Sequence, residues 1–533
     1  MKLVYVSSVS ATFELKNKQI YYSKEKYDVY LNNKPVLKSI NTNVFSLYDL
    51  LPNTRYEVRI NDKIVVFNTL SVSEVISTKS IAGKEEDVTE KFQKIIDEAK
   101  ENALIVVEKG VYNITSLLLK SDMTLYIKKG ALLSCSINES DYKEIEGEVS
   151  LPDGSVKQVG TWEGDPRRMK LSILSAFEQK NIHIVGQGII DGNAQLSTWW
   201  VDYKNRPYAR PHMIFLNHCE NVFVQGIDIK NSPQWTVHPF FSKNVGFYDL
   251  KITNPKISPN TDGINPQCCN KVTIIGVHFS VGDDCIAIKS GKMYIGKKYK
   301  QPCENILIRN CLMQFGHGAV VLGSEMSGGI KNLTVERCYF DHTDRGLRIK
   351  TRRGRGDTAI IDNVEFNDIY MDNVLTPLVI NMFYFCDPDG KTEYVWSKEK
   401  LPVDDRTPYL GKFTFNNINA INVEVCSGYF YGLPEQPIKE ISINNSSFSF
   451  KENAESGTPA MMSFAEECLK RGFVFRNVKT VNINNVSLTG NEGEFMFLEG
   501  NEVINREWRN QILYFFWYDY RQRWNIRKDV IFN

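Results

Sequence analysis

Short strand-like segments recur along most of this chain, and their spacing limits the possible folds more than any other feature. Each begins with Asn or Lys, continues with alternating apolar residues and ends in a polar turn. From the second segment onwards the starts are 23, 27, 34, 27 and 31 residues apart. Leucine-rich repeats would show their Leu and Asn framework, and propeller blades need about forty residues. The remaining fit is a parallel β-helix. The segments start at Asn181, Asn221, Asn244, Lys271, Asn305, Asn332 and Asn363.

The first 75 or so residues follow another pattern, with short alternating runs separated by turns such as Asn32-Asn33-Lys34-Pro35. This pattern predicts a β-sandwich. The stretch from Leu51 to Val58 resembles the corner of a fibronectin type III domain, in which a tyrosine, here Tyr56, bonds back to the backbone. We therefore divide the chain into a fibronectin type III-like sandwich at 1–76, a β-helix at 77–500 and a C-terminal extension at 501–533 that could cap it.

One convincing helix is predicted in the first half of the chain, over residues 87–100. Val88, Phe92 and Ile96 share one face of it, and Asp87 is a plausible N-cap. The end of a β-helix needs covering, because the first coil would otherwise leave its strand edges and core open. We expect this helix to be the lid of the first coil.

The overall composition excludes several classes of protein. The chain is 42% hydrophobic and 24% charged with a net charge of +1, as in ordinary globular proteins. No stretch is apolar for the ~18 residues that a membrane span requires, so no membrane partner is expected. The first residues lack the apolar core of a signal peptide, which favours the cytoplasm, or a leader that has been removed.

The cysteines and the basic residues point to no metal or nucleic acid. Most of the eleven cysteines lie in apolar strand contexts typical of buried, reduced thiols. The pair Cys268-Cys269 has no matching Cys or His pair, so we predict no zinc site. The basic run from Arg345 to Arg355 is typical of a solvated face or an anion site. It lacks the interleaved aromatic residues of a nucleic-acid surface.

Four short motifs fall on consecutive repeats. Their separations are 21, 33 and 31 residues, about one coil each. Neighbouring coils stack ~4.7–4.9 Å apart, so side chains one coil apart on the same face should converge. The motifs are Asn260-Thr261-Asp262-Gly263, Gly282-Asp283-Asp284-Cys285, Gly316-His317-Gly318 and Arg348-Ile349-Lys350.

The three acids of these motifs suit acid–base chemistry. Asp283 and Asp284 are adjacent and would point to opposite faces of a strand, so the chain must bend at Gly282 for both to serve one site. Three close carboxylates, those of Asp262, Asp283 and Asp284, repel one another, so at least one should have a raised pKa and keep its proton. A protonated acid beside an ionised base is what glycoside hydrolysis requires. Surface acids or a calcium site are the alternatives, although calcium would not explain the neighbouring cations.

The other two motifs supply an imidazole and two cations. His317 lies between glycines, which let the backbone turn sharply and present the ring. Arg348 and Lys350 are two apart on a strand and therefore share a face. A guanidinium fork beside an ammonium suits the carboxylate of an acidic sugar. A structural histidine and a solvated basic edge are the simpler alternatives.

Taken together, these motifs resemble the polygalacturonase family, glycoside hydrolase family 28. The strings Ser258–Gly263 and Gly282–Gly291 carry the resemblance together with the histidine and cation motifs, within a match from about 80 to 490. The resemblance implies an inverting, metal-independent hydrolase on the pectin-lyase-like right-handed parallel β-helix. It implies no cofactor, a pectic polysaccharide or oligogalacturonide as substrate, and no nucleic-acid partner.

The resemblance also implies a role for each motif residue. Asp283 would be the general acid, and Asp262 and Asp284 would activate the attacking water. His317 would tune the protonation of the acid or orient the sugar. Asn260 would orient the water or Asp262, and Arg348 and Lys350 would bind the galacturonate carboxylate. At Asn265 relatives often carry Asp, a difference from which we expect little effect.

Two long insertions interrupt the predicted coils, at roughly 137–170 and 384–410. Loops of this length in a compact domain are usually functional. With the leading β-domain they resemble the bacterial exo-acting members, which release mono- or digalacturonate from the non-reducing end. Loops that only stabilise the fold are the alternative. Two other functions stay open: a pectate or pectin lyase, and a β-helix that binds polysaccharide without cutting it.

Overall fold

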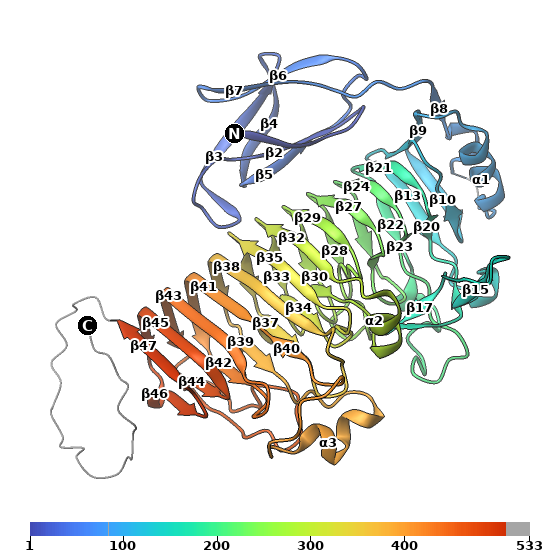
Figure 1. Ribbon diagram of the computed structural model, residues 1–533. Helices are drawn as coiled ribbons and strands as arrows, with labels where there is room; N and C mark the ends of the chain where they lie inside the picture. The colour runs from blue at the N-terminus through green and yellow to red at the C-terminus, as the bar shows by residue number, and fades with distance from the viewer. Residues whose placement is uncertain (84, 508–533) are drawn as a thin grey trace, which may run out of the picture.

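The computed structural model describes residues 1–83 and 85–507, and its main body is a parallel β-helix (Figure 1). Two faces of the helix join into one 23-stranded sheet that includes β8 (Val75–Ser77) and β47 (Val503–Glu507). The predicted fold class, a parallel β-helix with a small N-terminal β-sandwich, is confirmed. The capping role suggested for the C-terminal extension falls mainly on residues 508–533, outside the described residues.

The third face of the β-helix carries the four motifs. It consists of a four-stranded and a seven-stranded parallel sheet, linked by single bridges from Ile264 to Val237 and to Ile286. The first sheet contains β11 (Leu117–Leu118), β20 (Leu174–Phe177), β23 (Ile214–Asn217) and β26 (Val237–Phe240). The second contains β31 (Ile286–Ile288), β34 (Val320–Gly323), β37 (Arg345–Lys350), β39 (Thr376–Asn381), β42 (Cys426–Tyr431), β44 (Arg471–Arg476) and β46 (Glu492–Glu499).

The residues that begin each repeat explain the regular stacking. All of them have a positive φ, a left-handed conformation that asparagine tolerates better than most residues. The side-chain amide of Asn244 donates to Asn221 at 2.6 Å, and that of Asn363 donates to Asn332 at 2.9 Å. Lys271 interrupts this ladder, and the Asn305 amide bonds instead to Asn270 at 3.5 Å. The asparagines thus turn the chain and tie neighbouring coils together.

Apolar residues of equivalent position stack along the interior. In the large sheet Val222 pairs with Val245 and Val245 with Val272, and all three are buried. The stack continues through Ile306 and Leu333. All eleven cysteines are free thiols and ten are buried, so they pack as small apolar side chains. One continuous core therefore runs along the axis of the coils.

The predicted lid is present as α1 (Thr89–Glu98) at the N-terminal end of the β-helix (Figure 1). Phe92 and Ile96 are buried in the main core. The predicted cap is wrong: the N-cap is Val88, which makes no side-chain capping bond. Asp87 lies one residue earlier, where its carboxylate accepts a hydrogen bond from the Thr89 N–H at 2.7 Å.

The N-terminal sandwich consists of two antiparallel sheets. Tyr56 is buried, and its hydroxyl accepts a hydrogen bond from the Leu51 N–H at 2.8 Å, which confirms the predicted bond back to the backbone. One sheet contains β1 (Lys2–Val6), β2 (Ala11–Glu14) and β5 (Val44–Leu47). The other contains β4 (Lys34–Thr42), β3 (Tyr22–Leu31), β6 (Arg55–Ile60) and β7 (Lys63–Asn68).

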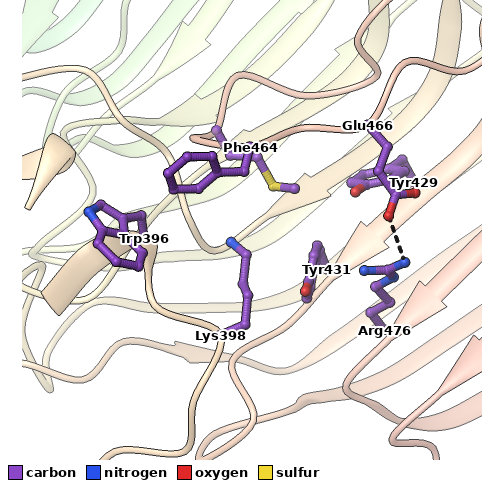
Figure 2. A pocket seen from close by; sticks show the side chains of 8 residues that line it. Trp396, Lys398, Tyr429, Tyr431, Phe464, Glu466 and Arg476 are labelled. Carbon is purple, nitrogen blue, oxygen red and sulfur yellow. Dashed lines mark hydrogen bonds and ion pairs between the residues drawn. The ribbon is translucent and has the colours of Figure 1, made fainter. Parts of the chain in front are cut away.

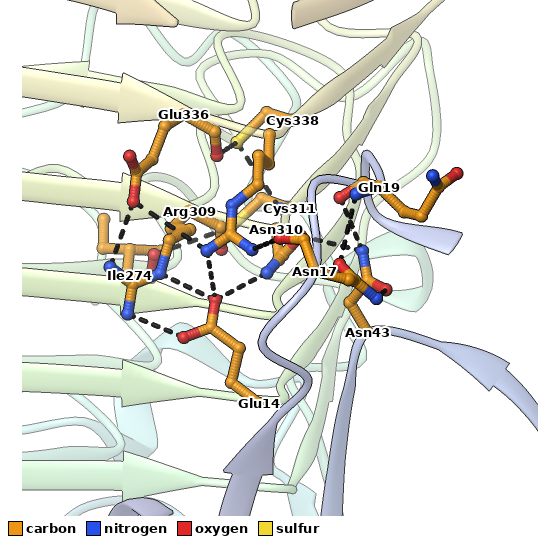
Figure 3. Close-up of polar contacts among 11 residues, drawn as sticks. Glu14, Asn17, Gln19, Asn43, Ile274, Arg309, Asn310, Cys311, Glu336 and Cys338 are labelled. Atoms are coloured by element: carbon orange, nitrogen blue, oxygen red, sulfur yellow. Dashed lines mark hydrogen bonds and ion pairs between the residues drawn. The ribbon is translucent and has the colours of Figure 1, made fainter. Parts of the chain in front are cut away.

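A buried carboxylate fastens the sandwich to the large sheet. Glu14 accepts hydrogen bonds from Arg309 at 2.7 and 2.8 Å, from Asn310 at 2.6 Å and from Arg337 at 2.8 Å (Figure 3). Arg309 ends β32 (Cys303–Arg309), and Arg337 follows β35 (Ile330–Glu336). The sandwich therefore docks on the 23-stranded sheet and not on the face that carries the motifs.

Both predicted insertions fold as compact additions to the coils. The first contains three two-stranded antiparallel sheets: β14 (Glu144–Ile145) with β19 (Met169–Lys170), β15 (Glu148–Ser150) with β16 (Val156–Gln158), and β17 (Thr161–Trp162) with β18 (Asp165–Pro166). The second contains η4 (Pro388–Lys391), α3 (Glu393–Trp396) and β40 (Tyr409–Leu410). Within residues 1–83 and 85–507, no helix has the length and apolarity to cross a membrane.

Candidate active site

The four motifs meet on the third face, at neighbouring strands. Asp283 and Asp284 precede β31, the Gly316-His317-Gly318 turn precedes β34, and Arg348 and Lys350 belong to β37. The backbone pairs Ile286 with Val320 and Val320 with Leu347, so each motif is one strand from the next. The Ile264 bridge places Asp262 on the adjoining coil. The predicted convergence of one-coil spacings is therefore present.

Asp284 forms ion pairs with both Arg348 and Lys350. Its carboxylate accepts a hydrogen bond from Lys350 Nζ at 2.6 Å and from Arg348 Nη1 at 3.3 Å, and its side chain is 2% exposed. Gly318 lies beside this group, since a Cβ there would lie 3.4 Å from Asp284 Oδ1 and 2.4 Å from Val321 Cγ2. The glycine therefore leaves room for the ion pair and for the turn that presents His317.

Asp283 is paired with the imidazole. His317 Nδ1 lies 3.3 Å from Asp283 Oδ1, and the Asp284 N–H donates to the same oxygen at 2.9 Å. Burial alone would raise the pKa of Asp283, but the His317 bond and the charges of Lys350 and Arg348 outweigh it and lower that pKa to about 2. The bond to Asp283 raises the pKa of His317 to about 8, against the effect of burial. At neutral pH the proton of this pair lies on the imidazole.

Asp262 is the carboxyl group that keeps a proton. Burial and then the charge of Asp283 hold its pKa well above the ordinary value. Its Oδ2 accepts a hydrogen bond from Asn265 Nδ2 at 2.7 Å. The prediction that at least one carboxylate has a raised pKa is confirmed. The raised pKa belongs to Asp262 and not to Asp283, because the bond to His317 stabilises the ionised form of Asp283. The family resemblance, in contrast, gives the role of the acid to Asp283.

Asn260 contacts a residue that the sequence did not single out. Its Oδ1 accepts a hydrogen bond from Arg210 Nη2 at 2.7 Å, and Arg210 also donates to the carbonyls of Pro233 and Pro259 at 2.7 and 3.1 Å. Asn265, from which little was expected, is the residue that bonds to Asp262. Arg210 lies in an irregular segment before β23, so no strand pattern marked it.

A further buried ion pair borders Asp262. Lys289 Nζ lies 2.7 Å from Glu325 Oε2, and 4.4 Å from the centre of the Trp235 ring. The charge of Lys289 partly offsets the rise in the pKa of Asp262. Glu325 and Trp235 escaped the sequence analysis because they lie in turns between the strands. Lys289 could have been identified from the sequence, because it belongs to the string Gly282–Gly291 that carries the family resemblance.

For residues Arg352–Arg355, the predicted solvated face or anion site is wrong. Arg352, Arg353 and Arg355 are 1–3% exposed. Arg352 is bonded to Asp389 at 2.7 and 2.8 Å, and Arg355 to Asp387 at 3.1 Å. The prediction failed because the acids that pair with these arginines lie in the second insertion, more than thirty residues later. These arginines hold that insertion against the coils.

The two insertions meet beside the site. Lys292 Nζ lies 3.6 Å from Asp165 in the first insertion and 3.3 Å from Asp387 in the second. Trp162 of the first insertion lies on Trp235, with ring centres 4.9 Å apart, and the guanidinium of Arg210 is 5.7 Å from the Trp162 ring. Because Trp235 precedes β26, the first insertion covers the face on the N-terminal side of Asp262.

The residues that the structure describes contain no group of three or more His, Cys, Asp or Glu side chains placed to hold a metal ion. The arrangement instead combines a protonated carboxyl, an ionised carboxylate with an imidazolium partner, and a third carboxylate under two cations. Such a site can donate a proton, accept one and hold an anion.

Comparisons with known proteins identify the same region. A family model described as glycosyl hydrolases family 28 matches residues 144–407. A probable polygalacturonase of Vitis vinifera is 28% identical over 387 residues, 72% of this chain and 73% of that protein. An exo-poly-alpha-D-galacturonosidase of Dickeya chrysanthemi is 26% identical over 385 residues, 63% and 61% of the two chains.

The solved structures agree in fold. A family 28 exopolygalacturonase of Yersinia enterocolitica superposes with a TM-score of 0.68 at 19% identity, over 95% of this chain and 97% of the other. A hyperthermoactive exopolygalacturonase of Thermotoga maritima gives 0.62 at 24% identity, over 78% and 92%. The matched residues 144–407 contain the whole acid, imidazole and cation row. Over this matched region the chain is similar to family 28 of the glycosyl hydrolases.

Proposed function

We propose that this enzyme hydrolyses the α-1,4 linkages of polygalacturonate or oligogalacturonides with inversion, from the non-reducing end. The observation that carries the proposal is the row in which Asp262, Asp283 and Asp284 lie beside Arg348 and Lys350. An acid and a base serve the glycosidic bond. Two cations against one carboxylate leave a net positive charge, which suits the carboxylate of a galacturonate unit.

In the proposed reaction, Asp283 gives its proton to the glycosidic oxygen while the bond from that oxygen to the sugar carbon breaks. A water molecule forms the new bond to the carbon from the opposite side and loses its proton to Asp262, with Asp284 helping to orient it. The products are a free hemiacetal of inverted configuration and the shortened chain. Arg348 and Lys350 hold the sugar carboxylate, and Asn260 helps to position the water.

This reaction needs the proton on Asp283 and not on Asp262, the reverse of the distribution favoured by the pKa directions. The two carboxyls are coupled, since the charge of Asp283 raises the pKa of Asp262. Moving one proton from Asp262 to Asp283 therefore keeps the charge of the pair unchanged. His317 provides a second route, because its imidazolium is bonded to Asp283 and can return a proton to it.

The activity of the enzyme should fall at alkaline pH as His317 loses its proton. The pKa of His317 is raised from 6.5 to about 8, so its bond to Asp283 is fully present below about pH 6.5 and is lost as pH rises through about 8. We expect kcat/KM to decline above about pH 8, and His317→Asn to lack this decline while its maximal rate is lower. An unchanged alkaline limb in that variant would contradict the assignment.

The first insertion supports the exo mode. Trp162 covers Trp235, and Gly164 O accepts a hydrogen bond from the Lys292 N–H at 2.9 Å. A Cβ at Gly164 would lie 2.7 Å from Glu325 Cγ, so the insertion is closely seated. A polysaccharide chain that cannot continue past the first insertion must enter the site by its end. The insertion acts as the wall of the proposed terminal subsite.

Product analysis on an end-labelled oligogalacturonide tests the proposal. With the label at the non-reducing end, we expect labelled mono- or digalacturonate from the first minutes, with no labelled fragments of intermediate length and no absorbance from an unsaturated product. Labelled fragments of intermediate length would mean endo attack, and a new ultraviolet absorbance that a calcium chelator abolishes would mean a lyase. Binding without cleavage would mean a non-catalytic β-helix.

Opening the wall should change the product pattern. Trp162→Ala removes the ring that lies on Trp235, and we expect released fragments longer than the dimer to appear early, at roughly a tenth of the product, which corresponds to a remaining discrimination of about 1.4 kcal/mol. Early-time chromatography measures this. An unchanged pattern in a variant of unchanged stability would show that the insertion does not set the mode of attack.

A further inference from the structure

A pocket of about 210 Å³ lies beyond the active site, towards the C-terminal end of the same sheet (Figure 2). It is built by the second insertion, by strands β42 and β44, and by the loop between β43 (Ile438–Phe450) and β44. The lining residues are Trp396, Lys398, Tyr429, Tyr431, Met462, Phe464, Glu466 and Arg476.

The strand register places this pocket in line with the catalytic cations. Lys350 pairs with Asn381 of β39, which pairs with Tyr431 of β42. Arg348 is related in the same way to Tyr429. Two strand spacings amount to ~9–10 Å. A polymer that crosses the strands at the active site would therefore reach the two tyrosines as it continues towards the C-terminal coils.

One loop borders both the active site and the pocket. The Met461 carbonyl accepts a hydrogen bond from Asn381 Nδ2 at 2.9 Å, and the Met461 sulfur contacts the guanidinium of Arg348. The next residue, Met462, bridges to Tyr384 and lines the pocket. The two sites are therefore neighbouring parts of one surface.

The pocket contains a cation without an anionic partner. Lys398 Nζ is buried and has no hydrogen-bond partner among the described residues. It lies 3.3 Å from the centre of the Phe383 ring and 4.9 Å from that of Tyr431. Burial and then the charges of Arg353 and Arg476 lower its pKa to about 7. Glu466 pairs with Arg476 at 3.2 Å, so Lys398 is the cation left for a ligand.

Aromatic side chains form the walls around this cation. Phe464 is 78% exposed, and its ring meets that of Trp396 edge-on with centres 5.5 Å apart. Figure 2 shows Lys398 extending between Trp396 and Tyr431, with its nitrogen directed towards Phe464. The flexible four-carbon stem of lysine lets the ammonium turn from the rings to an incoming carboxylate. Apolar walls with one orienting charge are typical of ligand pockets.

We propose that this pocket is a second anchoring site for the substrate, which binds a galacturonate unit on the reducing-end side of the cleaved bond. Lys398 takes the sugar carboxylate, and Trp396 and Phe464 cover the apolar face of the ring. The inference rests on the proposed function. The first insertion covers the face on the N-terminal side of the active site. The uncut part of the polysaccharide therefore extends towards this pocket, on the C-terminal side.

The test compares kcat/KM over a series of oligogalacturonides of increasing length. We expect Lys398→Met to lower kcat/KM by about tenfold on long oligomers, as for the loss of one charged hydrogen bond, and by progressively less as the substrate shortens. Phe464→Ala, which removes an exposed ring, should show the same length dependence. Lys400→Met removes a charge two residues away in the same loop at an exposed position and serves as the matched control.

The outcomes separate this inference from the proposed function. An equal loss at every length, no loss at any length, or an equal loss in Lys400→Met would overturn the pocket assignment while leaving the hydrolase intact. An unmutated enzyme that cleaves no oligogalacturonide would refute the proposed function itself. Unchanged thermal unfolding of Phe464→Ala excludes a folding defect, since its ring is mostly in solvent.

Discussion

Replacing Asp283 with Asn should lower kcat on polygalacturonate by roughly 10²–10⁴-fold, the usual contribution of a general acid or base. The amide keeps the size of the side chain but cannot deliver a proton to the glycosidic oxygen. It also leaves Arg348, Lys350 and Asp284 in place, so binding of the substrate should be retained. Release of reducing ends measures the rate, and a binding isotherm measures affinity.

A second readout distinguishes a catalytic defect from a structural one. The bond to Asp283 is the largest cause of the raised pKa of His317. In Asp283→Asn the imidazole should therefore titrate well below the value of about 8 in the unmutated protein, which nuclear magnetic resonance can follow. Asp62→Asn, an exposed change in the N-terminal sandwich, is the control. Full turnover in Asp283→Asn would disprove the assignment of the acid.

The second large effect concerns the stability of the second insertion. Arg353→Met should destabilise the protein by about 3–5 kcal/mol, because it leaves the Glu435 carboxylate buried without its partner. Arg353 is 1% exposed and bonds to Glu435 at 2.6 and 2.9 Å. It also donates to the carbonyls of Ser397 at 2.6 Å and Glu399 at 3.0 Å. Denaturant unfolding measures the loss, and proteolysis within 384–410 should show where it arises.

Two further variants test this explanation. The double variant Arg353→Met with Glu435→Met should recover much of the loss, because the carboxylate is no longer buried unpaired. Arg406→Met breaks a pair with Asp404 whose side chains are 51% and 33% exposed, and should leave the unfolding midpoint unchanged. If the double variant were as unstable as Arg353→Met, the lost stability would come from the backbone bonds rather than from the stranded charge.

The features that could be predicted from the sequence were those specified by a short local pattern that repeats along the chain. An asparagine in the left-handed conformation followed by alternating apolar residues specifies one turn and one strand, and repetition specifies the stack. Once coils stack, a separation of one repeat becomes a distance of one strand. The positions of Asp262, Asp283, His317 and Arg348 on one face could therefore be predicted without coordinates. The helix over Thr89–Glu98 was likewise readable from its apolar face.

Only the tertiary structure decided which charges meet. His317 pairs with Asp283, Lys350 and Arg348 with Asp284, and Arg353 with Glu435, 82 residues away. These pairings set which carboxyl keeps its proton and turned an apparently solvated basic run into a buried anchor. A pKa depends on burial and on the charges within a few ångströms, and neither is encoded in the spacing of residues along the chain. The repeats alone thus determined the row of side chains. The packing of neighbouring coils determined its electrostatics, and the folding of the second insertion helped to form the pocket beyond it.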